Sequence, residues 1–354
     1  MSDYKIVMAP DINSAKEYVE THNVVATVEA EYGDTCIEGK ELTLAHHGSR
    51  SNNPAPCNDD RAHELNGGEI LISHIDLDTV GGILAIMGQK FENPDFWAAA
   101  EYIDVNGVHH SHELSEDIQN MLNAYYAWGE THRGNRITEI TDVTEQILSQ
   151  KEILDIVLDQ NHPEHDEAIQ KGKEWHDRIT QAVESKLVDE NENVRVFKTD
   201  GTFCSASYYS PNQKTIVPAT VSFNTKFNAI TVAFEDGGTN LSAKDIVQRL
   251  WGKDAGGRDG IAGSPRNWEK STEELQYEFQ RASCFVKELV SLRKTSKDLS
   301  SEELYAAAEE KTNERLSEGT GNLKKCSFEL IESATKLGDV ISRNPKVPSN
   351  HPKR

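Results

Sequence analysis

One histidine and two aspartates follow a short apolar run at alternating positions. The run covers residues 70–72, and His74, Asp76 and Asp78 come directly after it. Alternate residues of an extended segment point to the same side, so this spacing brings an imidazole and two carboxylates together. Nitrogen and carboxylate-oxygen ligands suit Mn²⁺, Mg²⁺ or a similar divalent cation. The pattern by itself is more typical of a turn or a helix cap than of a metal site.

Two other segments share this pattern of a short apolar run that ends in His or Asp. Residues 42–48 carry His46 and His47, and residues 102–107 carry Asp104. We expect all three runs to be strands of one parallel sheet, whose carboxyl ends meet at the same edge. Buried carboxylates are costly unless they are paired or bound to metal. The three segments together therefore predict a divalent-metal centre.

The elements around these segments predict an α/β fold. A helix over residues 14–21 and a strand over 24–28 come first, and helical stretches over 82–87 and 115–128 follow the second and third runs. Alternation of strand and helix favours a parallel sheet with crossover helices. We divide the chain into a metal-binding catalytic domain, a helical connector, a smaller α/β substrate-binding domain and a helical C-terminal extension, over residues 1–150, 151–190, 191–270 and 271–354.

The second half of the chain combines strands with a glycine-rich loop. The strands are expected over residues 194–198, 203–209, 215–223 and 229–234. A helix over residues 242–250 follows, with Ser242 as its N-cap. The glycine-rich segment 252–266 comes next, and taken alone it is typical of a flexible loop, because it lacks the Lys and Ser or Thr of a P-loop.

The C-terminal part is predicted to be helical. Residues 272–342 have helical character, and Ser271 and Ser300 open sequences that resemble capping boxes. We expect these helices to pack on the body of the protein or to form the contact of a homo-oligomer. The Pro-rich residues 344–354 are expected to be loose.

Composition limits the partners of the protein. Lys and Arg number 37 and Asp and Glu number 59 among 354 residues, so the net charge is −22. Such a surface repels long polyanions, which disfavours duplex nucleic acid and anionic membranes, whereas a metal ion could still attract a small phosphorylated ligand. No apolar stretch approaches the ~20 residues of a membrane span, and no signal-like segment opens the sequence. The five cysteines form no Cys-x-x-Cys pair and indicate reduced thiols, so we expect a cytoplasmic protein.

Three segments resemble motifs of the DHH phosphoesterase superfamily. Residues 72–82 resemble its first motif, in which a His and two Asp after a strand hold the catalytic metals and a turn of small residues follows. Residues 42–48 resemble the Asp-His-His signature, with Ala45 in place of the Asp. Residues 256–266 are similar to the glycine-rich motif of the C-terminal DHHA1-type substrate domain. The resemblance covers about residues 40–270.

The chain departs from the superfamily pattern in two respects. The segment with two His precedes the segment with His74, which is the reverse of the usual order. Either the sheet is circularly permuted, or residues 104–110, which contain Asp104, His109 and His110, take the part of the signature. In addition, Ala45 cannot act as the signature Asp, and Asp104 is the candidate that replaces it.

The resemblance implies a metal-dependent phosphoesterase with two Mn²⁺ or Mg²⁺ ions, which activate a water for attack on phosphorus. It implies as metal ligands His46, His74, Asp76, Asp78 and Asp104. His47 and Asp104 would act in catalysis, with His47 touching the substrate phosphate or supporting His46. The expected phosphate contacts of the second domain are Arg258 and Arg266, together with the backbone of Gly256 and Gly257.

The resemblance also limits the substrate. It implies a small phosphodiester, phosphomonoester or phosphoanhydride, such as a short oligonucleotide, a dinucleotide or pyrophosphate. The alternative function is a catalytically impaired protein of the same fold that binds nucleotides or regulates, because Ala45 replaces an expected Asp.

Several other residues were candidates for chemistry. Residues 45–49 are similar to an element of metallo-β-lactamase-fold hydrolases, but residues 1–44 lack the His-rich motif that precedes it there. His109, His110 and His112 could bind metal or form a solvated turn. His162, His165 and Asp166 are expected on a helix surface, and Cys57 is expected to be a structural thiol.

Overall fold

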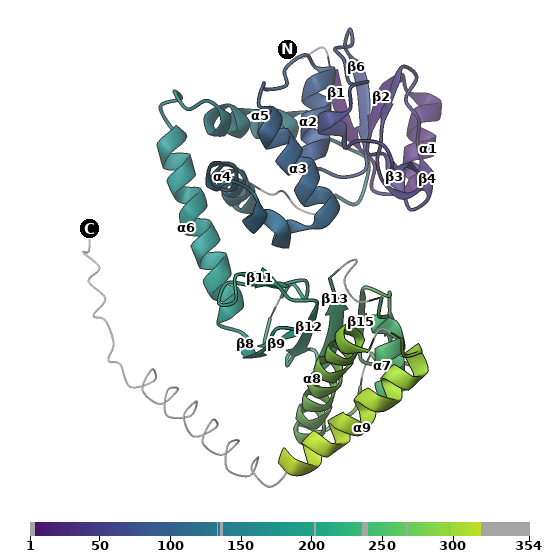
Figure 1. Ribbon diagram of the computed structural model, residues 1–354. Helices are drawn as coiled ribbons and strands as arrows, with labels where there is room; N and C mark the ends of the chain where they lie inside the picture. The colour runs from purple at the N-terminus through teal and green to yellow at the C-terminus, as the bar shows by residue number, and fades with distance from the viewer. Residues whose placement is uncertain are drawn as a thin grey trace, which may run out of the picture. The chain divides into compact units, whose positions relative to one another are not determined.

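The computed structural model describes residues 4–132, 134, 137–201, 203–235, 240–266, 268–296 and 298–319. The chain forms two compact units, with the boundary between Lys186 and Leu187 (Figure 1). Cys326, one of the five cysteines, and the Pro-rich residues 344–354 lie outside the described residues. No helix in the described part of the chain is long and apolar enough to cross a membrane.

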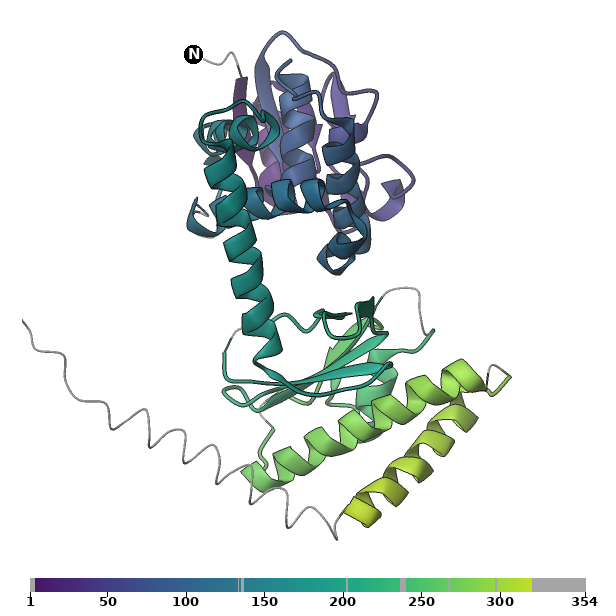
Figure 2. The ribbon, with the colours of Figure 1, turned by 60° about the vertical axis from the view of Figure 1, so that its left-hand side comes forward.

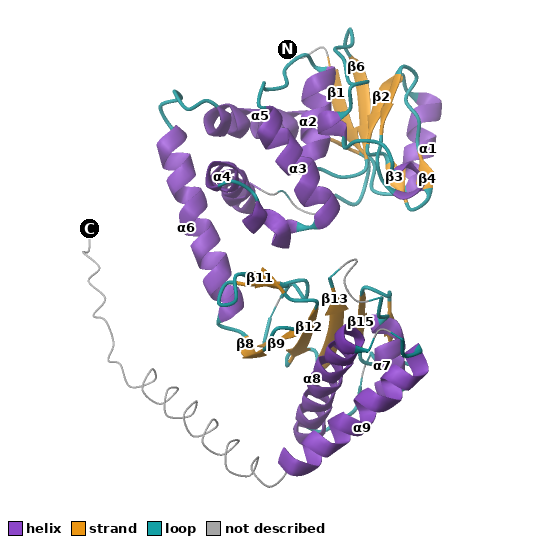
Figure 3. Cartoon of the chain, viewed as in Figure 1, coloured by secondary structure: helices purple, strands orange, loops and turns teal. Residues whose placement is uncertain are grey.

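The first unit is built on a five-stranded sheet (Figure 3). Its strands, in spatial order, are β5 (Leu42–Leu44), β2 (Val24–Val28), β6 (Gly68–Ile72), β1 (Tyr4–Met8) and β7 (Thr141–Asp142). The first four are parallel, and β7 pairs with β1 in the antiparallel sense. The predicted α/β class is confirmed, and so are the strands at β2, β5 and β6. A short hairpin, β3 (Glu31–Tyr32) with β4 (Thr35–Cys36), follows β2.

Helices cover both faces of this sheet. On one face, Ala15 and Tyr18 of α1 (Ile12–Thr21) pack against Val7, Val24 and Leu71. The opposite face is covered by helices whose apolar residues form the larger core: α2 (Leu77–Ile86), α3 (Pro94–Asn106), α4 (Glu116–His132) and α5 (Thr144–Leu158). The helix α6 (His165–Glu184) packs along α4. Three short 3₁₀ helices complete the unit: Gly48–Arg50, Pro56–Asn58 and Val108–Glu113.

The prediction that residues 102–107 form a strand is wrong, because residues 102–106 belong to α3 and Gly107 is its C-cap. Asn93 caps this helix by accepting a hydrogen bond from the N–H of Phe96, and Pro94 occupies its first turn. Buried residues recur at helical spacing, with Phe96, Ala99, Ala100 and Ile103 facing the core. No glycine or proline interrupts the chain from residue 95 until Gly107, which ends the helix with a positive φ of 94°.

The second unit contains a six-stranded mixed sheet. In spatial order its strands are β14 (Gly256–Gly257), β15 (Ile261–Gly263), β13 (Ala229–Phe234), β12 (Ala219–Asn224), β9 (Val194–Thr199) and β8 (Leu187–Glu190). β9 and β12 are parallel, and the other pairs are antiparallel. A separate hairpin pairs β10 (Tyr209–Ser210) with β11 (Thr215–Ile216).

Three helices complete this unit. Ser242 caps α7 (Ala243–Trp251), and Ser271 forms a capping box with Glu274 at the start of α8 (Thr272–Thr295), as predicted. α8 packs on β9 and β12, and α9 (Ser301–Gly319) runs beside α8 (Figure 2). The predicted helix starts at Ser271 and Ser300 are confirmed, since α8 ends before Ser296 and α9 begins at Ser301. Residues 320–342 of the predicted helical region lie outside the described residues.

The predicted strand over residues 203–209 is also wrong, apart from its last residue in β10. The buried guanidinium of Arg195 donates hydrogen bonds to the backbone carbonyls of Ser207 and Tyr209. These carbonyls are satisfied by a side chain, so this segment needs no partner strand there.

Candidate metal centre

The carboxyl ends of three adjacent strands form the site. β2 lies between β5 and β6, so the chain leaves all three strands at the same edge of the sheet. His46 and His47 follow β5, Glu29 follows β2, and His74 follows β6. The residue after the central strand is therefore placed between the two histidine-bearing segments.

Glu29 is the centre of this arrangement. Its Oε1 lies 2.7 Å from Nε2 of His46 and 3.3 Å from Nε2 of His47, and its Oε2 lies 2.8 Å from Nε2 of His74. The residue is fully buried, and its φ of 48° is in the left-handed region, which is unusual for a residue other than glycine. Such strain at a buried acid is typical of functional sites.

Glu29 is not among the ligands predicted from the sequence. Its segment, Val24–Val28 followed by Glu29, nevertheless has the same pattern of an apolar run that ends in a polar residue. A Glu at the end of such a run is therefore a signal of the same kind as a His or an Asp.

The N-terminus of α2 supplies two more carboxylates. Asp76 is the N-cap and accepts a hydrogen bond from the N–H of Thr79, and its Oδ2 lies 2.8 Å from Nε2 of His74. Asp78 lies in the first turn, and its Oδ2 is 3.3 Å from Nε2 of His46. The strand-to-helix turn therefore holds both carboxylates against the two histidines.

Asp104 reaches the same cluster from a helix. It lies near the end of α3, and its Oδ2 is 3.3 Å from Nε2 of His46. The expectation that Asp104 follows a strand is thus wrong, while its expected position beside His46 agrees with the distance. The three imidazoles and four carboxylates of this cluster, called the Glu29 cluster below, are His46, His47, His74, Glu29, Asp76, Asp78 and Asp104.

Two hydroxyl groups fix the orientation of the cluster. Thr79 donates a hydrogen bond of 3.0 Å from Oγ1 to Oε2 of Glu29. Ser73 donates to the backbone carbonyl of Glu29, and its Oγ also lies 2.8 Å from Nδ1 of His74. Contacts of this kind orient ligand side chains around a metal and set the tautomer of a histidine.

The carboxylates raise the pKa values of the histidines. Burial disfavours the charged form of His46, yet the nearby carboxylates of Asp104, Asp78 and Glu29 raise its pKa to about 12. The same opposition acts on His74, whose pKa is raised to about 11 by Asp76 and Glu29 despite its burial. Without a metal, both imidazoles therefore carry a proton at neutral pH.

The pKa values of Glu29 and Asp78 shift in opposite directions. Burial would raise the pKa of Glu29, but the three neighbouring imidazoles lower it. Burial raises the pKa of Asp78 to about 8, with the charges of Asp76 and Glu29 acting in the same direction against the effect of His46. Negative charge is thus crowded at Asp78, and a cation would relieve it.

The donor atoms of the Glu29 cluster fit a divalent cation. Four buried atoms form no hydrogen bond with the described residues, although they lie close together: Glu29 Oε1, His46 Nε2, Asp78 Oδ2 and Asp104 Oδ2. Several groups of three ligand atoms lie within 4.8 Å of one another, such as those of Glu29, His46 and Asp78, or of Glu29, His47 and His74. These atoms contact one another only as ion pairs, and buried polar atoms that form no hydrogen bond are costly, so a metal ion that they coordinate would stabilise them.

One side of the Glu29 cluster is open. The side chains of His47, His74 and Asp76 are 42%, 40% and 35% exposed, whereas those of Glu29 and Asp78 are at most 2% exposed. A ligand can therefore reach the cluster from the side of the exposed residues.

The glycine-rich segment of the second unit borders a cavity of about 880 Å³. Gly256, Gly257 and Arg266 line this cavity together with Trp251 and Trp268. Arg258 is exposed but is not among the lining residues, and its N–H donates to the carbonyl of Ile261 in the β14–β15 hairpin. The structure thus brings Arg266 and the two glycines together at one cavity, and it places Arg258 beside them on the hairpin.

The remaining candidates lie elsewhere. His109, His110 and His112 belong to the short helix after α3, where Nδ1 of His110 is 3.0 Å from Glu113. His162 lies in the connection between α5 and α6, and His165 and Asp166 are the first two residues of α6. Cys57 is buried, which raises the pKa of its thiol.

Comparison with known proteins finds only a distant structural similarity. No family model matches the chain, and no curated protein matches it. Among solved structures, the chain is similar to the pGpG-specific phosphodiesterase PggH from Vibrio cholerae, with 11% sequence identity and a TM-score of 0.38. The similarity covers 73% of this chain and 83% of that one. At this level of similarity, no activity follows for the present chain.

Proposed function

We propose that the protein is a metal-dependent phosphohydrolase of the DHH type and that the Glu29 cluster holds its divalent cations. The observation that carries the proposal is the convergence of three imidazoles and four carboxylates in one cluster, in which four buried nitrogen and oxygen atoms form no hydrogen bond with the described residues. Imidazole and carboxylate ligands suit Mn²⁺, and Mg²⁺ is the second candidate. When bound, two such cations supply an acidified water and neutralise charge on a phosphoryl group.

The distribution of ligands favours two cations rather than one. Oε1 of Glu29 lies beside His46 and His47, while Oε2 lies beside His74. One ion would be held by Glu29 Oε1 with His46, Asp78 and Asp104, and the other would be held by Glu29 Oε2 with His74 and Asp76.

The residues of the chain have distinct proposed roles. His47 is half-exposed at the open side, so it is placed to donate a hydrogen bond to a substrate phosphate or to transfer a proton. Thr79 and Ser73 hold Glu29 and His74 in position before substrate arrives. Asp104 is proposed to supply the carboxylate of the signature Asp, whose position in this chain is occupied by Ala45.

The substrate is proposed to be small and phosphorylated. The net charge of −22 disfavours long nucleic acids, whereas the cations of the Glu29 cluster would attract a single phosphate group. Arg258, Arg266, Gly256 and Gly257 are proposed to bind phosphate in the second unit, by their resemblance to the DHHA1-type motif. A guanidinium binds phosphate with two parallel hydrogen bonds.

The experiment compares the full chain with Asp76→Asn. Asn caps helices as well as Asp, so this variant should keep α2 intact while it removes one charged ligand. Wild-type protein is incubated with Mn²⁺ and a linear dinucleotide, pyrophosphate or a generic phosphodiester, and with EDTA as control. We expect turnover only with metal, and a loss of at least about 100-fold in kcat for Asp76→Asn at an unchanged unfolding temperature.

Two outcomes would contradict the proposed function. One is an Asp76→Asn variant with wild-type turnover. The other is wild-type protein that hydrolyses none of the three substrates while still binding nucleotide, which would instead support the impaired binding protein that Ala45 suggests.

A further inference from the structure

A cavity beside Asp76 has no part in the proposed hydrolysis. It has a volume of about 170 Å³ and lies between the start of α2 and the helices α4 and α5. Its lining residues are Ile75, Asp76, Leu77, Tyr125, Tyr126, Trp128, Gly129, His132, Gln146 and Gln150. Because Asp76 is both a member of the Glu29 cluster and a wall of this cavity, a ligand in the cavity would adjoin the proposed metal site.

Apart from the carboxylate of Asp76, the described lining consists of aromatic, apolar and polar side chains and contains no Lys or Arg. Trp128 is half-buried and stacks on His132, with ring centroids 4.4 Å apart and planes 7° apart. Gln146 and Gln150 add carboxamides, and Tyr125 donates a hydrogen bond to Oε1 of Gln150. No cationic side chain of this lining could bind a phosphate, whereas its aromatic rings could stack on a flat aromatic ligand.

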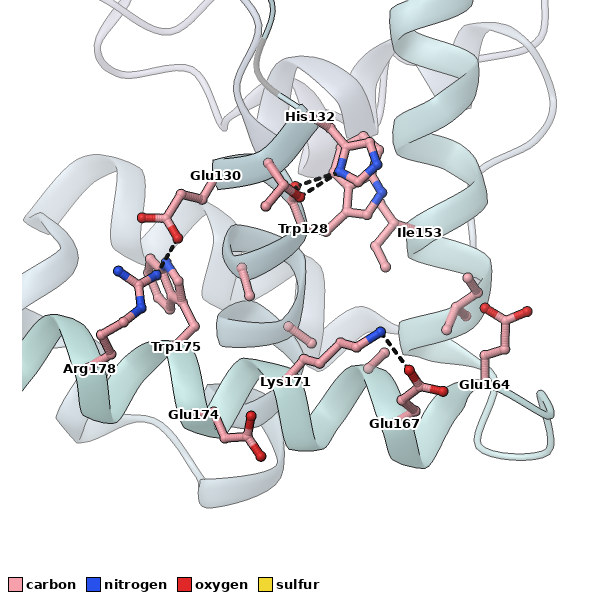
Figure 4. A pocket seen from close by; sticks show the side chains of 15 residues that line it. Trp128, Glu130, His132, Ile153, Glu164, Glu167, Lys171, Glu174, Trp175 and Arg178 are labelled. Carbon is pink, nitrogen blue, oxygen red and sulfur yellow. Dashed lines mark hydrogen bonds and ion pairs between the residues drawn. The ribbon is translucent and has the colours of Figure 1, made fainter. Parts of the chain in front are cut away.

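The larger neighbouring cavity is also unsuited to phosphate. It has a volume of about 670 Å³, shares Trp128 and His132 with the smaller one, and is bordered by α6 (Figure 4). Its two cations are already paired, Lys171 with Glu167 at 2.6 Å and Arg178 with Glu130. Two further carboxylates, those of Glu164 and Glu174, line it as well. Both cavities therefore disfavour the charged part of a substrate.

We propose that the cavity beside Asp76 binds a nucleobase of the substrate. The inference rests on the proposed function, since the phosphate of the same molecule is placed at the Glu29 cluster. Bases stack on aromatic side chains and carry hydrogen-bond donors and acceptors on one edge, which a carboxamide such as that of Gln146 can match. The substrate class is thus a nucleotide ester, and pyrophosphate is excluded as the preferred substrate.

The test compares two substrates that differ only in the base. One is a linear dinucleotide, and the other is its abasic counterpart with the same phosphodiester. Wild-type protein should have a KM about 10-fold or more lower for the dinucleotide, because stacking on one aromatic side chain is worth about 1–3 kcal/mol. Trp128→Leu should raise the KM for the dinucleotide about 10-fold and leave that for the abasic substrate unchanged, and Trp128→Phe should restore most of the difference.

Trp175→Leu is the matched control, since Trp175 lines only the larger cavity. It should leave both KM values unchanged. Equal effects of Trp128→Leu on both substrates would overturn the proposal, and so would a rise in KM for the dinucleotide caused by Trp175→Leu alone. Unfolding temperatures of all variants identify any that are misfolded.

A binding measurement separates this inference from the proposed function. If wild-type protein hydrolyses neither substrate, the proposed function fails, and calorimetry with a purine nucleoside 5′-monophosphate and with ribose 5-phosphate still tests the cavity. Binding of the nucleotide that is weakened about 10-fold by Trp128→Leu, with no binding of ribose 5-phosphate, supports the base site. Equal binding of both compounds, or no binding of the nucleotide, contradicts it.

Discussion

Nε2 of His46 lies 2.7 Å from Oε1 of Glu29, although the two residues follow different strands. β2 and β5 are adjacent and parallel, so the ends of both strands face the same edge. Glu29 follows the central strand of the three and therefore contacts histidines from both neighbours. A single buried carboxylate thus links the segments that the sequence motifs identify separately.

Removing the charge of Glu29 should weaken metal binding. Glu29→Gln keeps the size of the side chain but removes the negative charge that the proposed cations share. We expect the Kd for Mn²⁺, measured by calorimetry, to rise about 100-fold, and hydrolysis to be lost in parallel. Glu38→Gln, at an exposed carboxylate that pairs with Arg50, is the control and should bind Mn²⁺ as the wild type does. Unchanged Mn²⁺ affinity in Glu29→Gln would remove this residue from the site.

Asp104 should matter far more than another aspartate of the same helix. Asp104→Asn removes a carboxylate 3.3 Å from His46, whereas Asp95→Asn changes an exposed residue in the first turn of α3. We expect kcat to fall at least about 10-fold in the former and to stay within about twofold in the latter. Equal activities of the two variants would show that Asp104 does not replace the carboxylate missing at Ala45.

Metal binding should release protons, and its affinity should rise with pH. The pKa of His74 is raised to about 11 and that of Asp78 to about 8, so both groups carry a proton at pH 7 in the metal-free protein. A cation binds the deprotonated forms, so lower pH must weaken its binding. We expect the Kd for Mn²⁺ to fall as pH rises from 6 to 8. Calorimetry in buffers of different ionisation enthalpy measures the released protons, and an absence of release would contradict these roles.

The two arginines of the second unit should contribute unequally. Arg266 lines the cavity with Gly256 and Gly257, whereas Arg258 does not line it. We expect Arg266→Ala to raise KM about 10-fold with little change in kcat, because a ground-state phosphate contact affects binding. Arg258→Ala should have a smaller effect on KM. The opposite order, with Arg258→Ala the more damaging change, would show that the hairpin rather than the cavity contacts the substrate.

The sequence predicted the parts of the fold that depend on local pattern. The apolar runs of β2, β5 and β6 and the caps at Ser242 and Ser271 are local signals, and the structure confirms them. The strand expected around Asp104 is a helix, because the cap at Asn93 and the spacing of buried residues in α3 outweigh a short apolar run. The loop before Tyr209 depends on the distant Arg195, which no local pattern identifies.

The sequence predicted the histidines and aspartates of the candidate site but did not predict its central residue, Glu29. His46, His74, Asp76 and Asp78 follow strands in recognisable spacing, and the structure brings them within 3.3 Å of one another in pairs or through Glu29. Glu29 lies between the two histidine-bearing segments because β2 is the central strand of the three. That order, with β2 between β5 and β6, is a property of the whole sheet and is not written in any one segment.

Anomalous diffraction from crystals grown with Mn²⁺ would locate the cations proposed for the Glu29 cluster. We expect manganese peaks within ligand distance of Glu29, one beside His46 and Asp78 and one beside His74 and Asp76, and their loss in crystals of Glu29→Gln. A fully ordered Glu29 cluster without any manganese peak, at a Mn²⁺ concentration that supports binding in solution, would show that this cluster is not a metal site.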